Sequence, residues 1–282
     1  GAAGQEQHSN YGVQVYDGGV ITAGGNGTVT VEGQGGNTTG GNYNFGVIIV
    51  YGNAQITSSG GNVTVKGTGG TGKINNHGII LDDSGEITAG GNGTVNVEGQ
   101  AGNATGESNY GISLEGSITS TNGSITVKGT GSNGAADIMW DGGIISSTST
   151  TAGILINSTT NGTWPNTNTT DVSTTSTQKL SFVSGSKLNI QVFGLIMNTQ
   201  YEQLNAVGMV DLNGAGLTFA GSTYTPVVGN TFTIVNNDGS DAIIGTFSGL
   251  PEGAAIANFL GSGLDAKITY AGGDGNDVVL TV

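Results

Sequence analysis

The sequence contains no cysteine and no arginine. Without cysteine, the chain cannot form a disulfide, a thiolate metal site or a thiol nucleophile. All six of its basic residues are lysine, so no guanidinium is present to hold a phosphate or carboxylate with two hydrogen bonds. The formal net charge of −14 argues against nucleic acid and anionic membranes as partners. Cations, neutral glycans and other proteins remain.

Long apolar runs are also missing. No run reaches the roughly 18 residues of a membrane helix, and no charged-then-apolar signal peptide begins at Gly1. We therefore expect no direct membrane insertion. The chain does not begin with methionine. We interpret it as a mature or excised piece whose export signal, if it had one, has been removed, with a cloned fragment as the equal alternative.

Proline and charged residues are scarce, whereas glycine is abundant. The 282 residues include 3 prolines, 55 glycines and only 9% charged residues. This bias suits many tight turns, but it lacks the strict every-third glycine and the abundant proline of collagen. Hydrophobic residues make up 35% of the chain, enough to build a core. We expect short strands and turns rather than disorder.

A repeat of about 33 residues dominates the first half of the chain. Its first block starts with an asparagine, and the four copies begin at Asn10, Asn44, Asn76 and Asn109. Its second block reads ITAGGNGTVTVEGQGGN in the first copy, and related blocks begin at Ile21, Ile56, Ile87 and Ile118. A fixed period of this length is the signature of a repeat architecture.

Each copy holds three short stretches in which aliphatic and polar residues alternate, so we predict three strands per copy. The aligned copies give five aliphatic columns: Val13/Val47/Ile79/Ile112, Val15/Ile49/Leu81/Leu114, Ile21/Ile56/Ile87/Ile118, Val29/Val63/Val95/Ile125 and Val31/Val65/Val97/Val127. Burying each such side chain contributes about 1.5–3 kcal/mol to stability. Stacked copies can bury these side chains against one another, whereas a single copy cannot. We expect an all-β fold, a right-handed parallel β-solenoid (β-helix) with one coil per copy.

Two further columns predict that successive coils are direct neighbours. One follows the V-x-V pair and alternates in charge; its residues are Glu32, Lys66, Glu98 and Lys128. The other follows the repeated asparagine and contains rings; its residues are Tyr11, Phe45, His77 and Tyr110. We interpret both columns as structural ladders. His77 is expected to be a stacking ring rather than a metal ligand or catalytic base, because its column is aromatic.

The chain divides into three parts by composition. We expect the repeat solenoid over residues 1–156, including a degenerate fifth copy that starts near Ile138. The Ser/Thr/Asn-rich stretch 157–178 is expected to be a loop or linker. Residues 179–282 lose the period but keep strand and turn signals. We expect this C-terminal β region to be an irregular or sandwich-like cap or assembly domain, or a continuation of the solenoid with irregular coils.

Candidate catalytic groups are few, and we expect no enzyme activity. Ser-His-Asp catalysis would have to use His8 or His77, of which the first lies near the start and the second in the ring column. Acidic residues at predicted turns are Asp17, Asp82, Asp83, Glu86 and Glu115. Pairs drawn from Asp17, Asp82, Asp83 and Glu115 could line one edge as in a glycosidase, but we favour solvated turn acids. The alternative is a carbohydrate-active β-helix, either a tailspike-like hydrolase or a polysaccharide lyase.

One short motif suggests calcium. The segment from Gly272 to Leu280 fits the G-G-x-G-x-D-x-U-x nonapeptide of repeats-in-toxin calcium rolls. Such rolls hold Ca²⁺ between successive turns, so a single copy supplies half a site. We therefore expect no cofactor and favour a glycine-rich hairpin. If calcium binds here, Asp274 and Asp277 are the side chains to test.

The sequences of the repeats and of the tail resemble those of known bacterial proteins. The pattern ITAGGN…TVTVEGQGG resembles the β-helical passenger regions of filamentous-haemagglutinin-type exoproteins and autotransporters of Gram-negative bacteria. The tail, FTIVNNDGSDAIIGTFSGLPEGA followed by ITYAGGDGNDVVLTV, is similar to the ending of autotransporter-associated repeat proteins and other large bacterial surface proteins. This resemblance implies a secreted or cell-surface location and supplies no catalytic motif.

From these observations we expect an extracellular structural or adhesive rod. Open strand edges at the end of a solenoid recruit further strands unless they are capped, and the residues before Tyr11 are too few and too polar to cap one. The rod is then a subunit of a surface filament, sheath or matrix that associates end to end, or the shaft of an adhesin. Glycans and host or cell-surface proteins are further partners. A calcium-dependent matrix protein is a further alternative.

Overall fold

The computed structural model of the protein describes most of the chain. Described are residues 8–82, 84–133, 135, 137–140, 143–147, 154–158, 172–182, 187–197, 200–220, 224–237 and 240–282. All structural statements below concern these residues.

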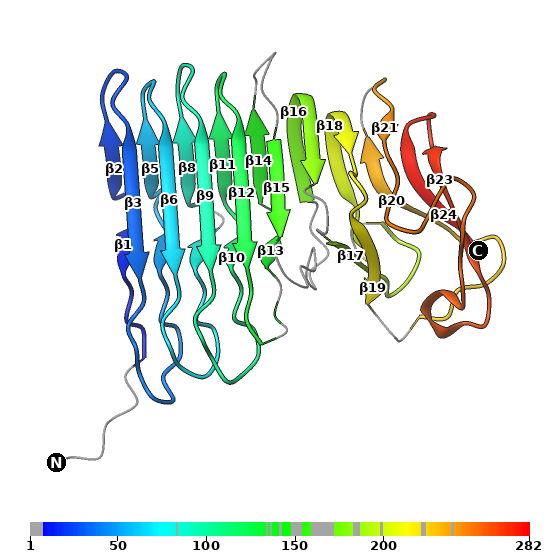
Figure 1. The fold of residues 1–282 in the computed structure, drawn as a ribbon, viewed down its shortest axis with the longest axis horizontal. Coiled ribbons are helices and arrows are strands. Elements are labelled where there is room, and N and C mark those ends of the chain that lie inside the picture. The colour runs from blue at the N-terminus through cyan, green and yellow to red at the C-terminus, as the bar shows by residue number, and fades with distance from the viewer. Residues whose placement is uncertain are drawn as a thin grey trace.

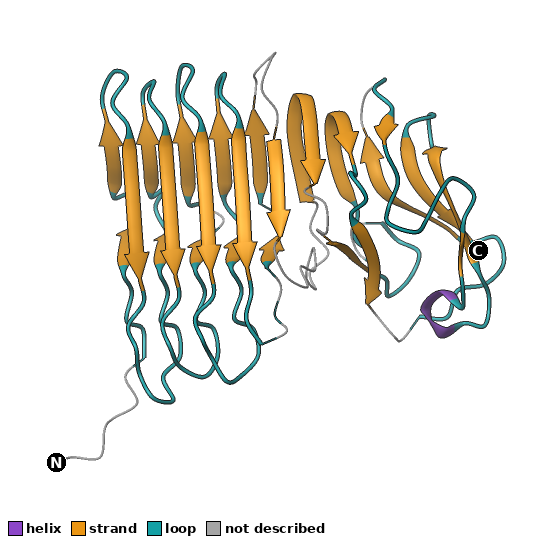
Figure 2. Ribbon diagram, in the orientation of Figure 1, coloured by secondary structure: helices purple, strands orange, loops and turns teal. Residues whose placement is uncertain are grey.

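Parallel strands stack into a β-solenoid of about six turns (Figures 1 and 2). Each of the first four coils is one sequence copy with three strands, as the repeat predicts. Coil 1 contains β1 (Val13–Tyr16), β2 (Val20–Ala23) and β3 (Val29–Gln34); coil 2 contains β4 (Val47–Val50), β5 (Gln55–Ser58) and β6 (Val63–Thr68). Coil 3 contains β7 (Ile79–Leu81), β8 (Glu86–Ala89) and β9 (Val95–Gln100); coil 4 contains β10 (Ile112–Leu114), β11 (Ser117–Ser120) and β12 (Ile125–Thr130).

The degenerate fifth copy also forms a coil. Its strands are β13 (Ile138–Trp140), β14 (Ile144–Ser147) and β15 (Ile154–Ser158). They pair in parallel with β10, β11 and β12 of coil 4. The register of the first four coils is therefore kept through the fifth.

The five aliphatic columns lie in register and form the core. Val65 pairs with Val97, and Val97 pairs with Val127, as the column predicts. In coils 2 to 4, every column side chain is exposed by 1% or less. Alternate side chains point outward, which confirms the predicted faces of these strands.

Two columns of glycine allow each coil to close onto the next. A Cβ on Gly67 would lie 2.1 Å from the Gly78 carbonyl oxygen, and one on Gly78 would lie 2.3 Å from the Gln100 nitrogen. Gly33 and Gly99 meet the backbone in the same way, at Gly46 and Gly111. Only glycine permits this approach, because the obstructing atoms are backbone that cannot move aside.

The parallel stack continues beyond the fifth coil. Strand β16 (Val172–Phe182) pairs with β14 through residues 173–176 and with β15 through residues 180–182. Strand β18 (Leu204–Asp211) pairs with β16, and β20 (Thr231–Asn237) and β21 (Ile243–Ile244) pair with β18. A separate parallel pair is formed by β17 (Lys187–Gln191) and β19 (Gly216–Ala220). Up to β21, the C-terminal region therefore continues the solenoid with irregular coils, which is one of the alternatives expected from the sequence.

Antiparallel strands close the C-terminal end of the stack, at the right of Figure 1. Strand β24 (Asp277–Thr281) pairs with β20 and with β23 (Ala266–Gly272), and β22 (Ala255–Ile256) pairs with β23. One 3-10 turn, η1 (Phe259–Gly261), lies beside them. In the described part of the chain, no helix has the length and apolar character needed to cross a membrane.

The predicted linker needs correction at both ends. Strand β15 runs to Ser158 and β16 begins at Val172, so residues 157–158 and 172–178 are strand rather than loop. The remaining residues, 159–171, lie outside the described residues. The composition misleads here because a parallel stack supplies backbone partners from neighbouring strands, and the β-branched threonines of this stretch favour extended backbone.

Candidate functional site

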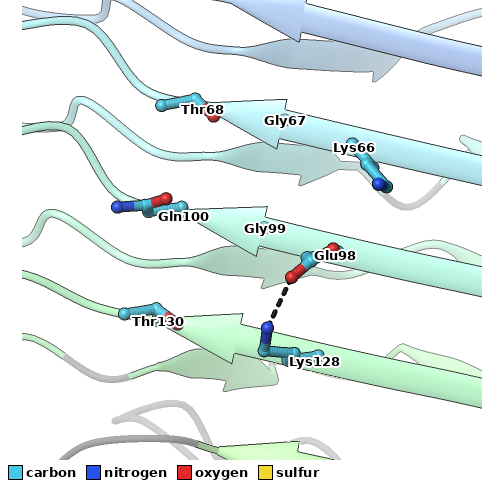
Figure 3. A pocket seen from close by; sticks show the side chains of 8 residues that line it. All are labelled: Lys66, Gly67, Thr68, Glu98, Gly99, Gln100, Lys128 and Thr130. Carbon is cyan, nitrogen blue, oxygen red and sulfur yellow. Dashed lines mark hydrogen bonds and ion pairs between the residues drawn. The ribbon is translucent and has the colours of Figure 1, made fainter.

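The charged column lies on the outer face of the β3–β6–β9–β12 sheet. Glu32 pairs in register with Lys66, Lys66 with Glu98, and Glu98 with Lys128. Lys128 Nζ lies 2.5 Å from Glu98 Oε1, an ion pair drawn as a dashed line in Figure 3. The hydrogen bond from Lys128 lowers the pKa of the Glu98 carboxyl, although partial burial opposes this effect. These side chains are 37% and 36% exposed, so solvent screens the interaction.

A shallow depression of about 260 Å³ surrounds this ion pair. It is lined by the ends of three strands: Lys66–Thr68 of β6, Glu98–Gln100 of β9, and Lys128 and Thr130 of β12 (Figure 3). It offers two ammonium groups, one carboxylate, and hydroxyl and amide groups. The depression is therefore a polar part of the repeated outer face.

The ring column forms a continuous stack. Ring centroids lie 5.2 Å apart for Tyr11 and Phe45, 5.4 Å for Phe45 and His77, and 4.9 Å for His77 and Tyr110, with planes within 6° of parallel. Burial lowers the pKa of His77 to about 3, so the imidazole is neutral at physiological pH. Its Nδ1 accepts a hydrogen bond from the Tyr110 N–H at 3.0 Å. The structure thus places His77 between two rings. His8, which is exposed, accepts a bond from the Asn42 N–H.

A ladder of buried asparagines stabilises the same corner of the coils. Asn44, Asn76 and Asn109 are 0% exposed. The side-chain amide of Asn10 donates to Asn44 Oδ1 at 2.9 Å, that of Asn44 to Asn76 Oδ1 at 3.0 Å, and that of Asn76 to Asn109 Oδ1 at 3.3 Å. In the sequence these asparagines mark the start of each repeat, and their buried side chains were not predicted. A polar residue kept at one position in four copies was the signal that could have revealed the ladder.

The turn acids serve neighbouring coils. The Asp82 carboxylate accepts hydrogen bonds from the Tyr51 N–H of coil 2, at 3.0 Å, and from the Ser84 hydroxyl, at 3.1 Å. Glu86 accepts a bond from the Gln55 side chain at 2.9 Å. Asp17 and Glu115 are exposed at the corresponding turns of their own coils, and Asp83 lies outside the described residues.

The glycine-rich nonapeptide forms a hairpin between antiparallel strands β23 and β24. Asp277 is 6% exposed, and its Oδ1 accepts a bond from the Asn237 N–H at 2.9 Å. Burial raises the pKa of the Asp277 carboxyl, and the charge of Asp274 raises it further. Asp274 itself is exposed. Among the described residues, no three His, Cys, Asp or Glu side chains gather closely enough to hold a metal ion.

One edge of coil 1 faces away from coil 2, and no described strand pairs with it. Within the described residues, β1 pairs only with β4, β2 only with β5, and β3 only with β6. Val20 on β2 is 52% exposed, and Val13 and Ile21 are partly exposed. Val13 and Ile21 belong to columns that are buried in coils 2 to 4, whereas Val20 pairs with Gln55 and lies on the outer face.

Comparison of the chain with protein family models, with curated proteins and with solved structures gave no match. The fold therefore defines the class. The protein is a β-solenoid repeat protein whose stack ends in antiparallel strands.

Proposed function

We propose that this protein is an extracellular, non-catalytic structural module that associates end to end in a bacterial surface filament, sheath or matrix. The observation that carries the proposal is the unpaired edge of coil 1, formed by β1, β2 and β3. An unpaired strand edge is a template for another strand, and natural proteins cover or charge such edges. Here the edge instead presents Val13 and Ile21, which are only partly buried although their column neighbours Val47 and Ile56 are 0% exposed.

In a filament, the partner at this edge is a β-structure of a second copy; in the shaft of a longer adhesin, preceding coils of the same protein would take its place. Pairing along three strands would satisfy their backbone groups and cover Val13 and Ile21. The net charge of −14 opposes random lateral clumping and leaves ordered axial contact as the favoured mode of association. Added salt strengthens this contact because it screens the repulsion between copies.

The location rests on resemblance and composition. The repeats resemble the passenger regions of Gram-negative exoproteins and autotransporters, which supports a secreted or cell-surface protein. The same rod can serve as the shaft of an adhesin, with glycans or cell-surface proteins as ligands. Long regular fibres under the electron microscope support the filament, whereas isolated short rods support the shaft.

Light scattering and negative-stain imaging across salt concentrations test the association. Val20→Asp places a charge on the open edge and should abolish end-to-end contact. Val228→Asp is the matched control, because Val228 is 78% exposed in the loop before β20, far along the chain from the edge. Association should persist in this control. A wild-type chain that stays monomeric at every salt concentration would remove the case for a filament subunit.

A separate assay addresses the carbohydrate-active alternative. The chain is incubated with a panel of polysaccharides at neutral pH, with and without Ca²⁺, and released reducing sugar is measured. We expect none. Steady release that is abolished by Asp82→Asn or Asp17→Asn would replace the structural proposal with an enzymatic one.

A further inference from the structure

Three segments meet where the C-terminal strands join the parallel stack. Asn237 ends β20, and Asp241 lies in the loop between β20 and β21. Asp277 begins β24, the return strand of the hairpin, and Asn276 directly precedes it. The side chains of Asn237, Asn276 and Asp277 are 0%, 5% and 6% exposed. Asp241 is exposed, so the cluster lies just beneath the surface.

Hydrogen bonds tie these segments together through Asn237. Its backbone N–H donates to Asp277 Oδ1 at 2.9 Å, and its side-chain Nδ2 donates to the Asp241 carbonyl oxygen at 2.5 Å. Asn276 Nδ2 donates to the same carbonyl at 3.2 Å. Asn237 is thereby bonded through its backbone to the Asp277 carboxylate and through its side chain to the Asp241 carbonyl.

The side-chain oxygen of Asn237 stands out in this cluster. Among the described residues, Asn237 Oδ1 is buried and accepts no hydrogen bond. Leaving a buried acceptor unsatisfied costs about 1–3 kcal/mol, and such groups are rare in native proteins. The Asp277 carboxylate, which accepts the Asn237 backbone N–H, is also removed from water. A buried oxygen without a donor and a buried carboxylate on bonded residues form an environment that a cation would satisfy.

We propose that this cluster binds Ca²⁺ through the Asp277 carboxylate, Asn237 Oδ1 and the Asp241 carbonyl. Calcium takes oxygen ligands of these three kinds in irregular arrangements and completes its shell with water, whereas Mg²⁺ demands a tight octahedron. A single carboxylate gives the weak affinity of extracellular modules, on the order of 10⁻⁴–10⁻³ M. Asp274 lies outside this ligand set, so the site differs from the half-site expected from the nonapeptide. The inference is independent of end-to-end association.

The first test is direct binding to the full chain. Isothermal titration with CaCl₂ should show one site of roughly millimolar affinity. At 10 mM Ca²⁺ the melting temperature should rise by about 3 °C over a chelator control at equal ionic strength. MgCl₂ should give a smaller shift. No binding heat and no Ca²⁺-dependent shift, or an equal shift with Mg²⁺ or NaCl, would overturn the proposal.

Matched variants locate the site. Asn237→Leu removes the unsatisfied oxygen at similar volume but also the hydrogen bond from Nδ2 to the Asp241 carbonyl. These effects oppose each other, so the melting temperature in chelator should change little while the Ca²⁺ shift is lost. Asp277→Asn should weaken binding at least about tenfold, because it removes the ligand charge. Asp274→Asn should keep the shift. A shift that Asp274→Asn abolishes and Asn237→Leu retains would overturn the ligand set. If Asn237→Leu does not fold, the two aspartate variants decide.

Discussion

Asn44 donates two hydrogen bonds to one atom of Asn76, the side-chain Oδ1. Its backbone N–H donates at 3.1 Å and its side-chain amide at 3.0 Å. Asn76 repeats this arrangement with Asn109 Oδ1, at 2.9 Å and 3.3 Å. Aliphatic columns alone would tolerate a slip of two residues, since such a slip keeps the same face inside. The asparagine ladder penalises that slip and fixes the register between coils.

Asn76→Ala should therefore destabilise the solenoid by about 2–4 kcal/mol, because it leaves buried donors of Asn44 without their acceptor. Urea unfolding followed by circular dichroism measures the change. Asn122→Ala is the control, since Asn122 is exposed at a turn, and should stay within about 0.5 kcal/mol of wild type. Equal losses in both variants would show that the ladder does not stabilise the fold.

The regular coils could be predicted from sequence because every coil repeats the same burial pattern. Val63, Val95 and Ile125 occupy one position in three copies, and the parallel ladder places them in register. The asparagine ladder was harder to predict. Asparagine is common in the turns of this chain, so its recurrence at one position in four copies suggests a turn residue as readily as a buried ladder.

The C-terminal half could not be settled from sequence because its strands do not recur at a fixed spacing. Strand β16, with 11 residues, pairs with two strands of the preceding coil, where earlier coils use two separate strands. The proposed cation cluster is equally hidden. Asn237 and Asp277 are 40 residues apart, and their contact depends on the antiparallel pairing of β20 with β24, which no local sequence motif predicts.

A buried charge in the core should unfold the repeats. Val97 is 0% exposed in the middle of an aliphatic column, so Val97→Asp places an unpaired carboxylate in a dry interior. This costs several kcal/mol, which is comparable to the whole free energy of unfolding of a native domain. Thr28→Asp, on the exposed side of the same sheet, should be nearly neutral. Circular dichroism and thermal melting compare the two. Similar effects from both variants would mean that the inner and outer faces have been confused.

Charge alternation on the outer face should contribute modestly and depend on salt. Lys66→Glu places three carboxylates in neighbouring strands, since position 66 pairs with both Glu32 and Glu98. We expect a loss of about 1–2 kcal/mol at low ionic strength that shrinks in 1 M NaCl. Lys267→Glu makes the same change in net charge at an exposed position of β23 and is the control. A loss at position 66 that salt does not reduce would argue for a packing effect instead.

The stacked imidazole should make stability depend on pH. The pKa of His77 is about 3 in the folded chain and about 6.5 in the unfolded chain, because burial between rings disfavours the charged form. As pH falls below 6.5, the unfolded chain takes up the proton first, so the stabilising contribution is complete above pH 6.5 and declines towards pH 3. The decline is about 1.4 kcal/mol per pH unit, or roughly 2 kcal/mol between pH 6.5 and 5.

His77→Phe keeps a ring in the column but cannot titrate, so its free energy of unfolding should fall less than that of wild type over the same interval. Losing the acceptor for the Tyr110 N–H lowers its stability at pH 7 by about 1 kcal/mol, and this offset does not change the slope. Asp277, whose pKa is raised by burial, works in the opposite direction and is present in both chains. Urea unfolding at pH 7.5, 6.5, 5.5 and 5.0 gives the two slopes. Parallel slopes would show that His77 has the same pKa in the folded and unfolded chains. The stacked column would then not disfavour the charged imidazole.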